Sequence, residues 1–214
     1  MNDLVLDTRR ASLSRAAAGA HFSVAKRAFD LVVATLLLLP LTVLFGFVLL
    51  AWNAAFDRGP LFFVQKRMGH GCRPIRVWKF RSMTHGGRIR RRADDPLEVA
   101  RITAMGRFIR RTRIDELPQV VNVLRGEMSV IGPRPDYFPH ALQYLRTIPG
   151  YRQRHAIRPG ITGLAQVSVG YAEGTDATRG KVAADLAYVS GLGYALDMRI
   201  VLRTLGVILS CRGV

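Results

Sequence analysis

The chain has 214 residues, 49% of them hydrophobic, so we expect one main globular domain with an attached segment rather than two domains. Its 32 Lys and Arg against 15 Asp and Glu give a formal charge of +17, which predicts an anionic partner: nucleic acid, an acidic lipid surface or a phosphate-rich substrate. Two isolated cysteines and five histidines without metal-ligand spacing argue against a disulfide framework and against a zinc site.

A long hydrophobic run, LVVATLLLLPLTVLFGFVLLAWNAAF, covers residues 31–56 without one charged side chain. As a helix it would be about 39 Å long, against a hydrocarbon core of about 30 Å. Pro40 interrupts the run and is expected to kink or break the helix. Basic residues lie near both ends, so the positive charges favour neither orientation. A kinked spanning helix, a re-entrant helix with both ends on one side, and a buried helix of a soluble protein are the alternatives.

Two short strands are predicted after this run, at residues 61–64 and 75–80, with turn signals before each. Side-chain alternation in the second strand places Lys79 and Arg81 on one face at its end. Residues 85–95, HGGRIRRRADD, predict a basic loop that is solvated or faces lipid.

A helix is predicted over residues 99–111, and the Asp115-Glu116 pair begins the next one. Apolar side chains recur at helical spacing over residues 117–124, and Gly126 is placed to end the helix. Asp115 is a natural N-cap that points away from the apolar stripe, so we expect both carboxylates to be open to solvent or ligand.

The remaining segments predict a strand at residues 128–131 and a helical region at 182–209 with a break at 191–193. Arg134 lies between two prolines, which restrict its backbone. Residues 140–158 mix apolar side chains with arginines, a pattern typical of the lipid headgroup layer.

The Asp115-Glu116 pair permits two interpretations. A helix cap that complements the helix dipole explains both residues locally. A carboxylate can also attack phosphorus to give an acyl phosphate, and nearby arginines are expected to keep Asp115 ionised. Mg²⁺ prefers one or two carboxylates together with substrate phosphate oxygens, so Glu116 is then its expected ligand.

Long ordered motifs favour the second interpretation. They are KRAFD at 26–30, GPLFFVQ at 59–65, KFRSM at 79–83, DELPQVVNVLRGEMSVIGPRP at 115–135 and RPGITGLAQV at 158–167. In this order they closely resemble the bacterial sugar transferases, the monotopic phosphoglycosyl transferases, which are also called polyprenyl-phosphate hexose-1-phosphate transferases. The resemblance implies transfer of a sugar 1-phosphate from a UDP-sugar to polyprenyl (undecaprenyl) phosphate with release of UMP, as the first membrane step of exopolysaccharide, capsule or glycoconjugate synthesis.

The resemblance also implies roles for particular residues. Asp115 corresponds to the covalent nucleophile and Glu116 to the Mg²⁺ ligand. The family's cations correspond to four residues that we assign to phosphate handling: Lys79, Arg81, Arg110 and Arg134. The family architecture favours the re-entrant helix, broken at Pro40, with both termini cytoplasmic.

Together these observations predict an α+β protein. It comprises an N-terminal basic segment (1–25), a re-entrant membrane helix (26–56) and a small mixed helix and short-sheet catalytic domain with interfacial amphipathic helices (57–214). It is expected on the cytoplasmic face of the bacterial inner membrane, bound to an anionic lipid surface, with Mg²⁺ as cofactor, no nucleic-acid partner and a homodimer allowed. The alternative is a basic membrane-anchored module that binds lipid or nucleic acid without catalysis.

Three departures from the family pattern affect the details: Leu39 in place of a frequent Ser, Arg113 in place of a small polar residue, and residues 167–171 in place of Asn-Gly-Arg. The last of these leaves the identity of the sugar open.

Overall fold

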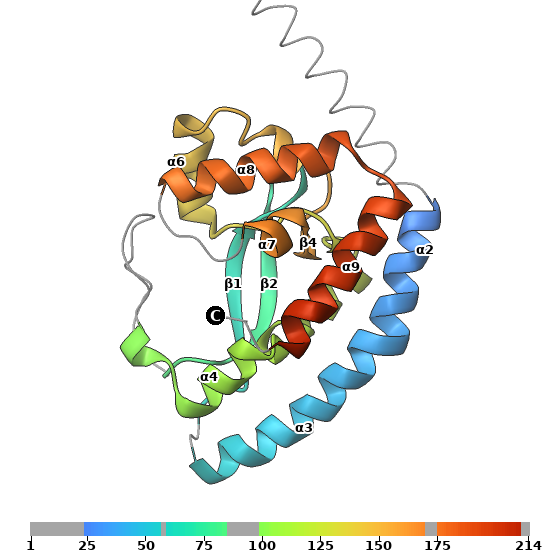
Figure 1. Cartoon of the computed structure of the whole chain (residues 1–214). Coiled ribbons are helices and arrows are strands. Elements are labelled where there is room, and N and C mark those ends of the chain that lie inside the picture. Colours follow the sequence, from blue (N-terminus) through green and yellow to red (C-terminus); the bar gives the residue numbers. More distant parts are fainter. Residues whose placement is uncertain (1–23, 57–58, 85–98, 170–174, 211–214) are drawn as a thin grey trace, which may run out of the picture.

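The computed structural model describes residues 24–56, 59–84, 99–169 and 175–210 (Figure 1). One side of the molecule is a helical stretch made of α2 (Val24–Val33), a π-helical segment (Ala34–Leu38) and α3 (Leu39–Phe56). By length and composition this is the one helix in the described ranges that is able to cross a membrane. Figure 1 shows it bowed along the rest of the protein.

The predicted break at Pro40 is not confirmed, because every residue from Val24 to Phe56 is helical. The π-helical segment directly before Pro40 changes the hydrogen-bond pattern: the Leu39 N–H donates to the carbonyl of Ala34, one residue further back than in an α-helix. The hydroxyl of Thr42 donates to the Leu38 carbonyl at 2.6 Å. The wider turn thus accommodates the proline without ending the helix.

The predicted strand pair is confirmed as an antiparallel hairpin of β1 (Phe62–Met68) and β2 (Pro74–Phe80), with a first strand longer than expected. Its turn contains the short 3₁₀ segment His70–Cys72, in which Gly71 has φ 63°. The register pairs Phe63 with Lys79 and Gln65 with Val77. Alternate residues of both strands therefore share the face on which Lys79 lies.

A second, parallel pair joins β3 (Ser129–Ile131), as predicted, to β4 (Gly160–Thr162). The two backbones come very close beyond the end of β3. A Cβ on Gly160 would lie 2.1 Å from the nitrogen of Gly132, so a residue without a side chain is required at position 160.

Helices cover these strands (Figure 1). They are the 3₁₀ turn Val99–Arg101, α4 (Ala104–Arg111), α5 (Val120–Leu124), α6 (Phe138–Thr147), the 3₁₀ turn Gln153–Ala156, α7 (Leu164–Ser168), α8 (Thr175–Ser190) and α9 (Tyr194–Leu209). The expected helix at 99–111 is thus helical from Val99 to Arg101 and from Ala104 to Arg111. The predicted break at 191–193 is confirmed, since it separates α8 from α9.

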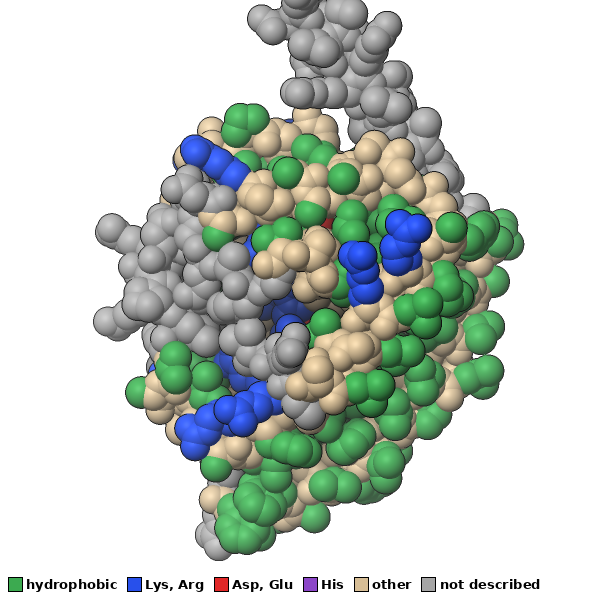
Figure 2. Space-filling view, in the orientation of Figure 1, with side chains coloured by type: hydrophobic (Ala, Val, Ile, Leu, Met, Phe, Trp, Pro, Cys, Tyr) green, Lys and Arg blue, Asp and Glu red, His purple; other side chains and the backbone are tan. Residues whose placement is uncertain are grey.

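The expectation that residues 140–158 lie in the headgroup layer is wrong for their largest side chains. Tyr144, Ile148 and Tyr151 are buried in a cluster with Met68 and Val182. The apolar surface lies elsewhere, on α3 and α9, and Figure 2 shows hydrophobic side chains spread over the α3 side of this face. Its most exposed members include Phe47, Phe56, Tyr194, Met198, Leu202 and Leu209. The basic loop predicted at 85–95 lies outside the described residues.

Candidate active site

The Asp115-Glu116 pair lies in a 3₁₀ helix, Ile114–Gln119, that leads directly into α5. The prediction that Asp115 caps an α-helix is therefore wrong; the residue before the helix is Arg113, with φ 61° and ψ 12°. A left-handed conformation is uncommon for a residue with a Cβ and shows that the surroundings fix the chain at this point. Gly126, with φ 76°, follows α5 as predicted.

Both carboxylates are buried, contrary to expectation: Asp115 is 6% exposed and Glu116 is 4% exposed. Cations from two other elements surround Glu116. Lys79 of β2 donates to Oε1 at 2.9 Å, and Arg134 donates through Nη1 to Oε2 at 3.0 Å and through Nη2 to Oε1. This two-point contact between a guanidinium and a carboxylate is among the strongest hydrogen-bonded pairs in proteins.

Asp115 is held much less tightly than its neighbour. Its nearest cation is Lys79, with 3.7 Å between Nζ and Oδ2. In the described part of the chain no side chain donates a hydrogen bond to it within hydrogen-bond distance. Glu116 thus anchors the cations, while Asp115 is the less engaged of the two acids within the described ranges.

The pKa values of the two acids are shifted in opposite directions. Burial alone would raise the pKa of Glu116, but the charges of Arg134 and Lys79 outweigh it and hold that pKa well below its usual range. Burial raises the pKa of Asp115; Lys79 opposes this and the neighbouring Glu116 adds to it. The charges of Arg134 and Arg110 favour ionised Asp115, as expected, but burial outweighs them and the pKa is raised.

Further cations surround the pair. Arg113 Nη1 lies 3.8 Å from Glu116 Oε1, and the charge of Arg110 on α4 lowers the pKa of Asp115. Sequence reasoning missed Arg67 of β1, whose pKa is lowered to about 10 by burial and then by the charge of Arg134. Alternation along β1 puts Arg67 on one face with Phe63, the partner of Lys79, but only the hairpin register reveals this. Figure 2 shows basic side chains in a hollow on this face of the molecule.

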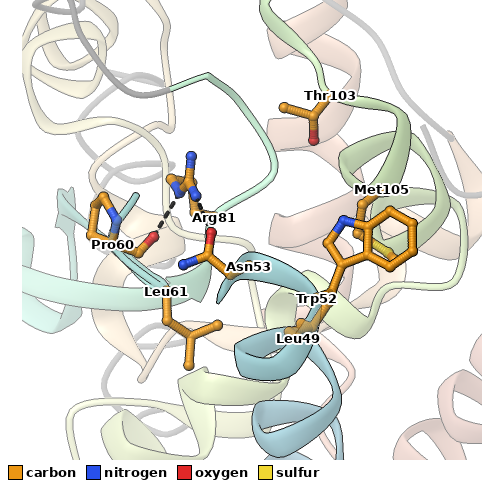
Figure 3. Close-up of a pocket in the computed structure, with 8 residues that line it drawn as sticks. All are labelled: Leu49, Trp52, Asn53, Pro60, Leu61, Arg81, Thr103 and Met105. Atoms are coloured by element: carbon orange, nitrogen blue, oxygen red, sulfur yellow. Dashed lines mark hydrogen bonds between the residues drawn. The ribbon is translucent and has the colours of Figure 1, made fainter. Parts of the chain in front are cut away.

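Arg81 is placed differently from the other predicted phosphate-handling residues. Its guanidinium donates to the Pro60 carbonyl and to Asn53 Oδ1, each at 2.6 Å, beside a small pocket at the end of α3 (Figure 3). Asn53 in turn donates to the Gly59 carbonyl at 2.5 Å. These contacts fasten α3 to the end of β2. The structure thus gathers Lys79, Arg110 and Arg134 around the dyad and uses Arg81 at the helix junction.

The carboxylate pair fits the chemistry of Mg²⁺, which takes one or two protein carboxylates and completes its shell with substrate phosphate and water. Asp115 and Glu116 are adjacent hard-oxygen donors; both Glu116 oxygens accept from Lys79 or Arg134, so a metal ion at Glu116 would share that carboxylate with these cations. In the described ranges no group of three or more His, Cys, Asp or Glu gathers to form a cage made of protein alone.

Comparison with known proteins determines the family of the chain. The family model described as "Bacterial sugar transferase" matches residues 21–211. The chain belongs to this family. As its members are named transferases, a non-catalytic binding module is not favoured.

Two similar bacterial sugar transferases are much longer than this chain. One, from Aeromonas hydrophila, is named UDP-N-acetylgalactosamine-undecaprenyl-phosphate N-acetylgalactosaminephosphotransferase and is 45% identical over 71% of this chain and 36% of its own length. Another, from Escherichia coli (strain K12), is named UDP-glucose:undecaprenyl-phosphate glucose-1-phosphate transferase and is 42% identical over 84% of this chain and 39% of its own length. The chain thus spans little more than a third of these relatives.

A third relative has nearly the same length. The "Exopolysaccharide production protein PSS" of Rhizobium leguminosarum bv. phaseoli is 41% identical over 85% of this chain and 93% of its own length. Every element that forms the site, from β1 to β4, lies within the part matched by the family model.

Proposed function

We propose that this protein transfers a sugar 1-phosphate from a UDP-sugar to undecaprenyl phosphate and releases UMP, by way of a covalent intermediate on Asp115. The observation that carries the proposal is the difference between the contacts of the two carboxylates. Glu116 accepts hydrogen bonds from Lys79 and Arg134, whereas among the described residues Asp115 has only a longer ion pair, 3.7 Å from Lys79. The names of the relatives supply the substrate class.

In the first step an Asp115 oxygen attacks the phosphorus that carries the sugar. The bond from this phosphorus to the oxygen it shares with the UMP phosphate breaks, and UMP leaves with that electron pair. In the second step a phosphate oxygen of undecaprenyl phosphate attacks the same phosphorus. The bond to Asp115 then breaks, which restores the carboxylate and yields the lipid diphosphate sugar.

Lys79 and Arg134 are placed to stabilise the charge that develops in both steps. Glu116 fixes them before the substrate arrives, so they need little reorganisation when the phosphorus is attacked. Arg110 and Arg67 add positive potential that attracts a diphosphate substrate. Mg²⁺ held by Glu116, with Asp115 alongside, would supply further neutralisation of the diphosphate.

The proposed topology is re-entrant, with both ends of the membrane helix at the cytoplasmic face of the inner membrane. Three contacts along the helix support it: Lys26 to Asp197 of α9 at 2.7 Å, Thr42 to the Leu117 carbonyl at 3.1 Å, and Asn53 to Arg81 at 2.6 Å. The helix is about 24 Å long between the contacts of Lys26 and Thr42, and about 17 Å long between those of Thr42 and Asn53. Neither reaches the roughly 30 Å that a spanning segment needs.

Release of UMP tests the activity. The purified protein in detergent is incubated with undecaprenyl phosphate, Mg²⁺ and a panel that includes UDP-glucose and UDP-N-acetylgalactosamine. The expected result is UMP release with at least one UDP-sugar that depends on the lipid phosphate for continued turnover. Absence of release with every member of a broad panel would overturn the proposal.

Cysteine labelling tests the topology. Single cysteines replace Val24, at the first residue of the helix, and Lys66, after its end, in a background without the two native cysteines. Both are expected to resist a membrane-impermeant thiol reagent in intact cells and to react after permeabilisation. Labelling of one alone in intact cells would show a spanning helix.

A further inference from the structure

The backbone of the segment that carries Arg134 is held through its carbonyl groups. Residues 133–136 follow β3 without regular secondary structure, and the two prolines have no N–H to donate. Each of the four consecutive carbonyl oxygens nevertheless accepts a hydrogen bond. The donors are Gly160 N to Pro133 at 3.0 Å, Arg154 Nη2 to Arg134 at 2.8 Å, Arg67 Nη1 to Pro135 at 2.7 Å and Met68 N to Asp136 at 3.0 Å.

Arg154 donates to the carbonyl of Arg134, which is the residue of this segment that we assign to the substrate phosphate. The Arg154 side chain is itself held in place. It is 2% exposed, lies in the 3₁₀ turn Gln153–Ala156, and forms ion pairs with two acids. Nη2 lies 2.7 Å from Asp185 Oδ2 on α8, and Nη1 contacts the Asp136 carboxylate. The Tyr151 hydroxyl donates to the same Asp136 oxygen at 2.6 Å. One guanidinium thus connects α8 to the segment that carries Arg134.

We propose that Arg154 is a positioning residue: anchored to Asp185 and Asp136, it holds the carbonyl of Arg134 so that the Arg134 side chain meets Glu116 and the substrate phosphate. This inference rests on the proposed function. The Arg154 guanidinium contacts Asp136, Asp185, the Tyr151 ring and the Arg134 backbone, and of these Arg134 is the residue assigned to the substrate phosphate. A two-point contact tolerates little displacement, because both N–H groups must align at once.

A lysine cannot take this role. The arginine fork reaches three oxygens in fixed directions, whereas a lysine offers one point charge on a flexible stem. Arg154→Lys therefore keeps the buried charge near its acids and loses the bridge to the Arg134 carbonyl. This makes it a more selective probe than removal of the cation.

The test is a double-mutant cycle with Arg134→Ala, using UMP release at varied UDP-sugar concentration to separate kcat from KM. In the wild-type background Arg154→Lys is expected to lower kcat/KM by about 30- to 100-fold. In the Arg134→Ala background the same change is expected to cost less than about threefold, because the side chain to be positioned is gone. An equal fold loss in both backgrounds would overturn the inference.

Two further variants keep the test decisive. Tyr188→Phe removes a buried hydroxyl that donates to Asp197 at 2.7 Å, and as a stability control it should have the same small effect in both backgrounds. Asp185→Asn leaves Arg154 in place but weakens its anchor on α8; a loss of about threefold to tenfold is expected, again only when Arg134 is present. Wild-type protein that releases no UMP would overturn the proposed function, whereas active wild type with a normal Arg154→Lys variant would overturn this inference alone.

Discussion

Acidification is predicted to weaken the fold through His155, which is 3% exposed in the turn before β4. Burial, and then the charge of Arg154, lowers the pKa of His155 to about 3, against opposition from Asp136 and from a hydrogen bond with the Gly69 backbone. The ordinary value is 6.5, so the unfolded chain binds more protons between these two pH values. The contribution of His155 to stability is therefore complete above pH 6.5 and is lost as the pH falls toward 3.

The magnitude follows from the size of the shift. Each pH unit below 6.5 costs about 1.4 kcal/mol, so about 2 kcal/mol is lost by pH 5. Asp185 works in the opposite direction: burial raises its pKa to about 6, so its contribution is present at low pH and is lost as the pH rises through 6. Asp185 therefore partly offsets His155 in the wild type. The informative quantity is the difference between wild type and His155→Gln.

Unfolding followed by fluorescence of Trp52 and Trp78 in one detergent provides the assay. Between pH 7 and pH 5 the free energy of unfolding of His155→Gln should rise by about 2 kcal/mol relative to wild type, because glutamine does not titrate. Tyr188→Phe serves as the control and should shift the whole curve without changing its slope. If His155→Gln and wild type respond to pH in parallel, His155 is not the group responsible.

Three other predictions concern the helix, the metal and the backbone. Lys26→Met should cost about 3 kcal/mol of unfolding free energy by removing the cation that pairs with Asp197, and a Lys26→Met/Asp197→Leu double variant should recover part of it; additive losses would contradict this. EDTA should stop UMP release, and Glu116→Gln should raise the Mg²⁺ concentration for half-maximal rate at least about tenfold; an unchanged Mg²⁺ response would remove Glu116 as ligand. Gly160→Ala should lower the melting temperature sharply, whereas Gly180→Ala, at an open helical position, should raise it slightly; similar effects would refute the close backbone approach.

Local sequence patterns predicted the elements that have a clear apolar periodicity or that end at a glycine. The hairpin strands, β3 and the division between α8 and α9 depend on short-range signals, namely apolar alternation and glycines at the ends. The Asp115-Glu116 pair was found from its residue types and motif. The burial of this pair was not predicted, because a helical wheel cannot show that β2 and the Arg134 segment pack over a 3₁₀ helix.

The missed features depend on contacts between distant parts of the chain. Arg67 reaches the site only through the register of the hairpin, and the contacts of Arg81 with Asn53 and Pro60 join segments that lie far apart in the sequence. The helix at Pro40 continues because a π-helical segment accommodates the proline, which a rule for isolated helices does not anticipate. Tyr151 can be buried because Asp136 accepts a hydrogen bond from its hydroxyl.

The mass of the protein after incubation with a UDP-sugar, in the absence of undecaprenyl phosphate, tests the covalent intermediate most directly. With Asp115 as nucleophile, a sugar phosphate should be found on the peptide that contains Asp115, together with about one UMP per protein molecule, and later addition of undecaprenyl phosphate should remove it. Asp115→Asn should form no adduct and show no turnover, while the neighbouring Glu116→Gln should still form it slowly. Normal turnover by Asp115→Asn, or an adduct on any other residue, would contradict the assignment.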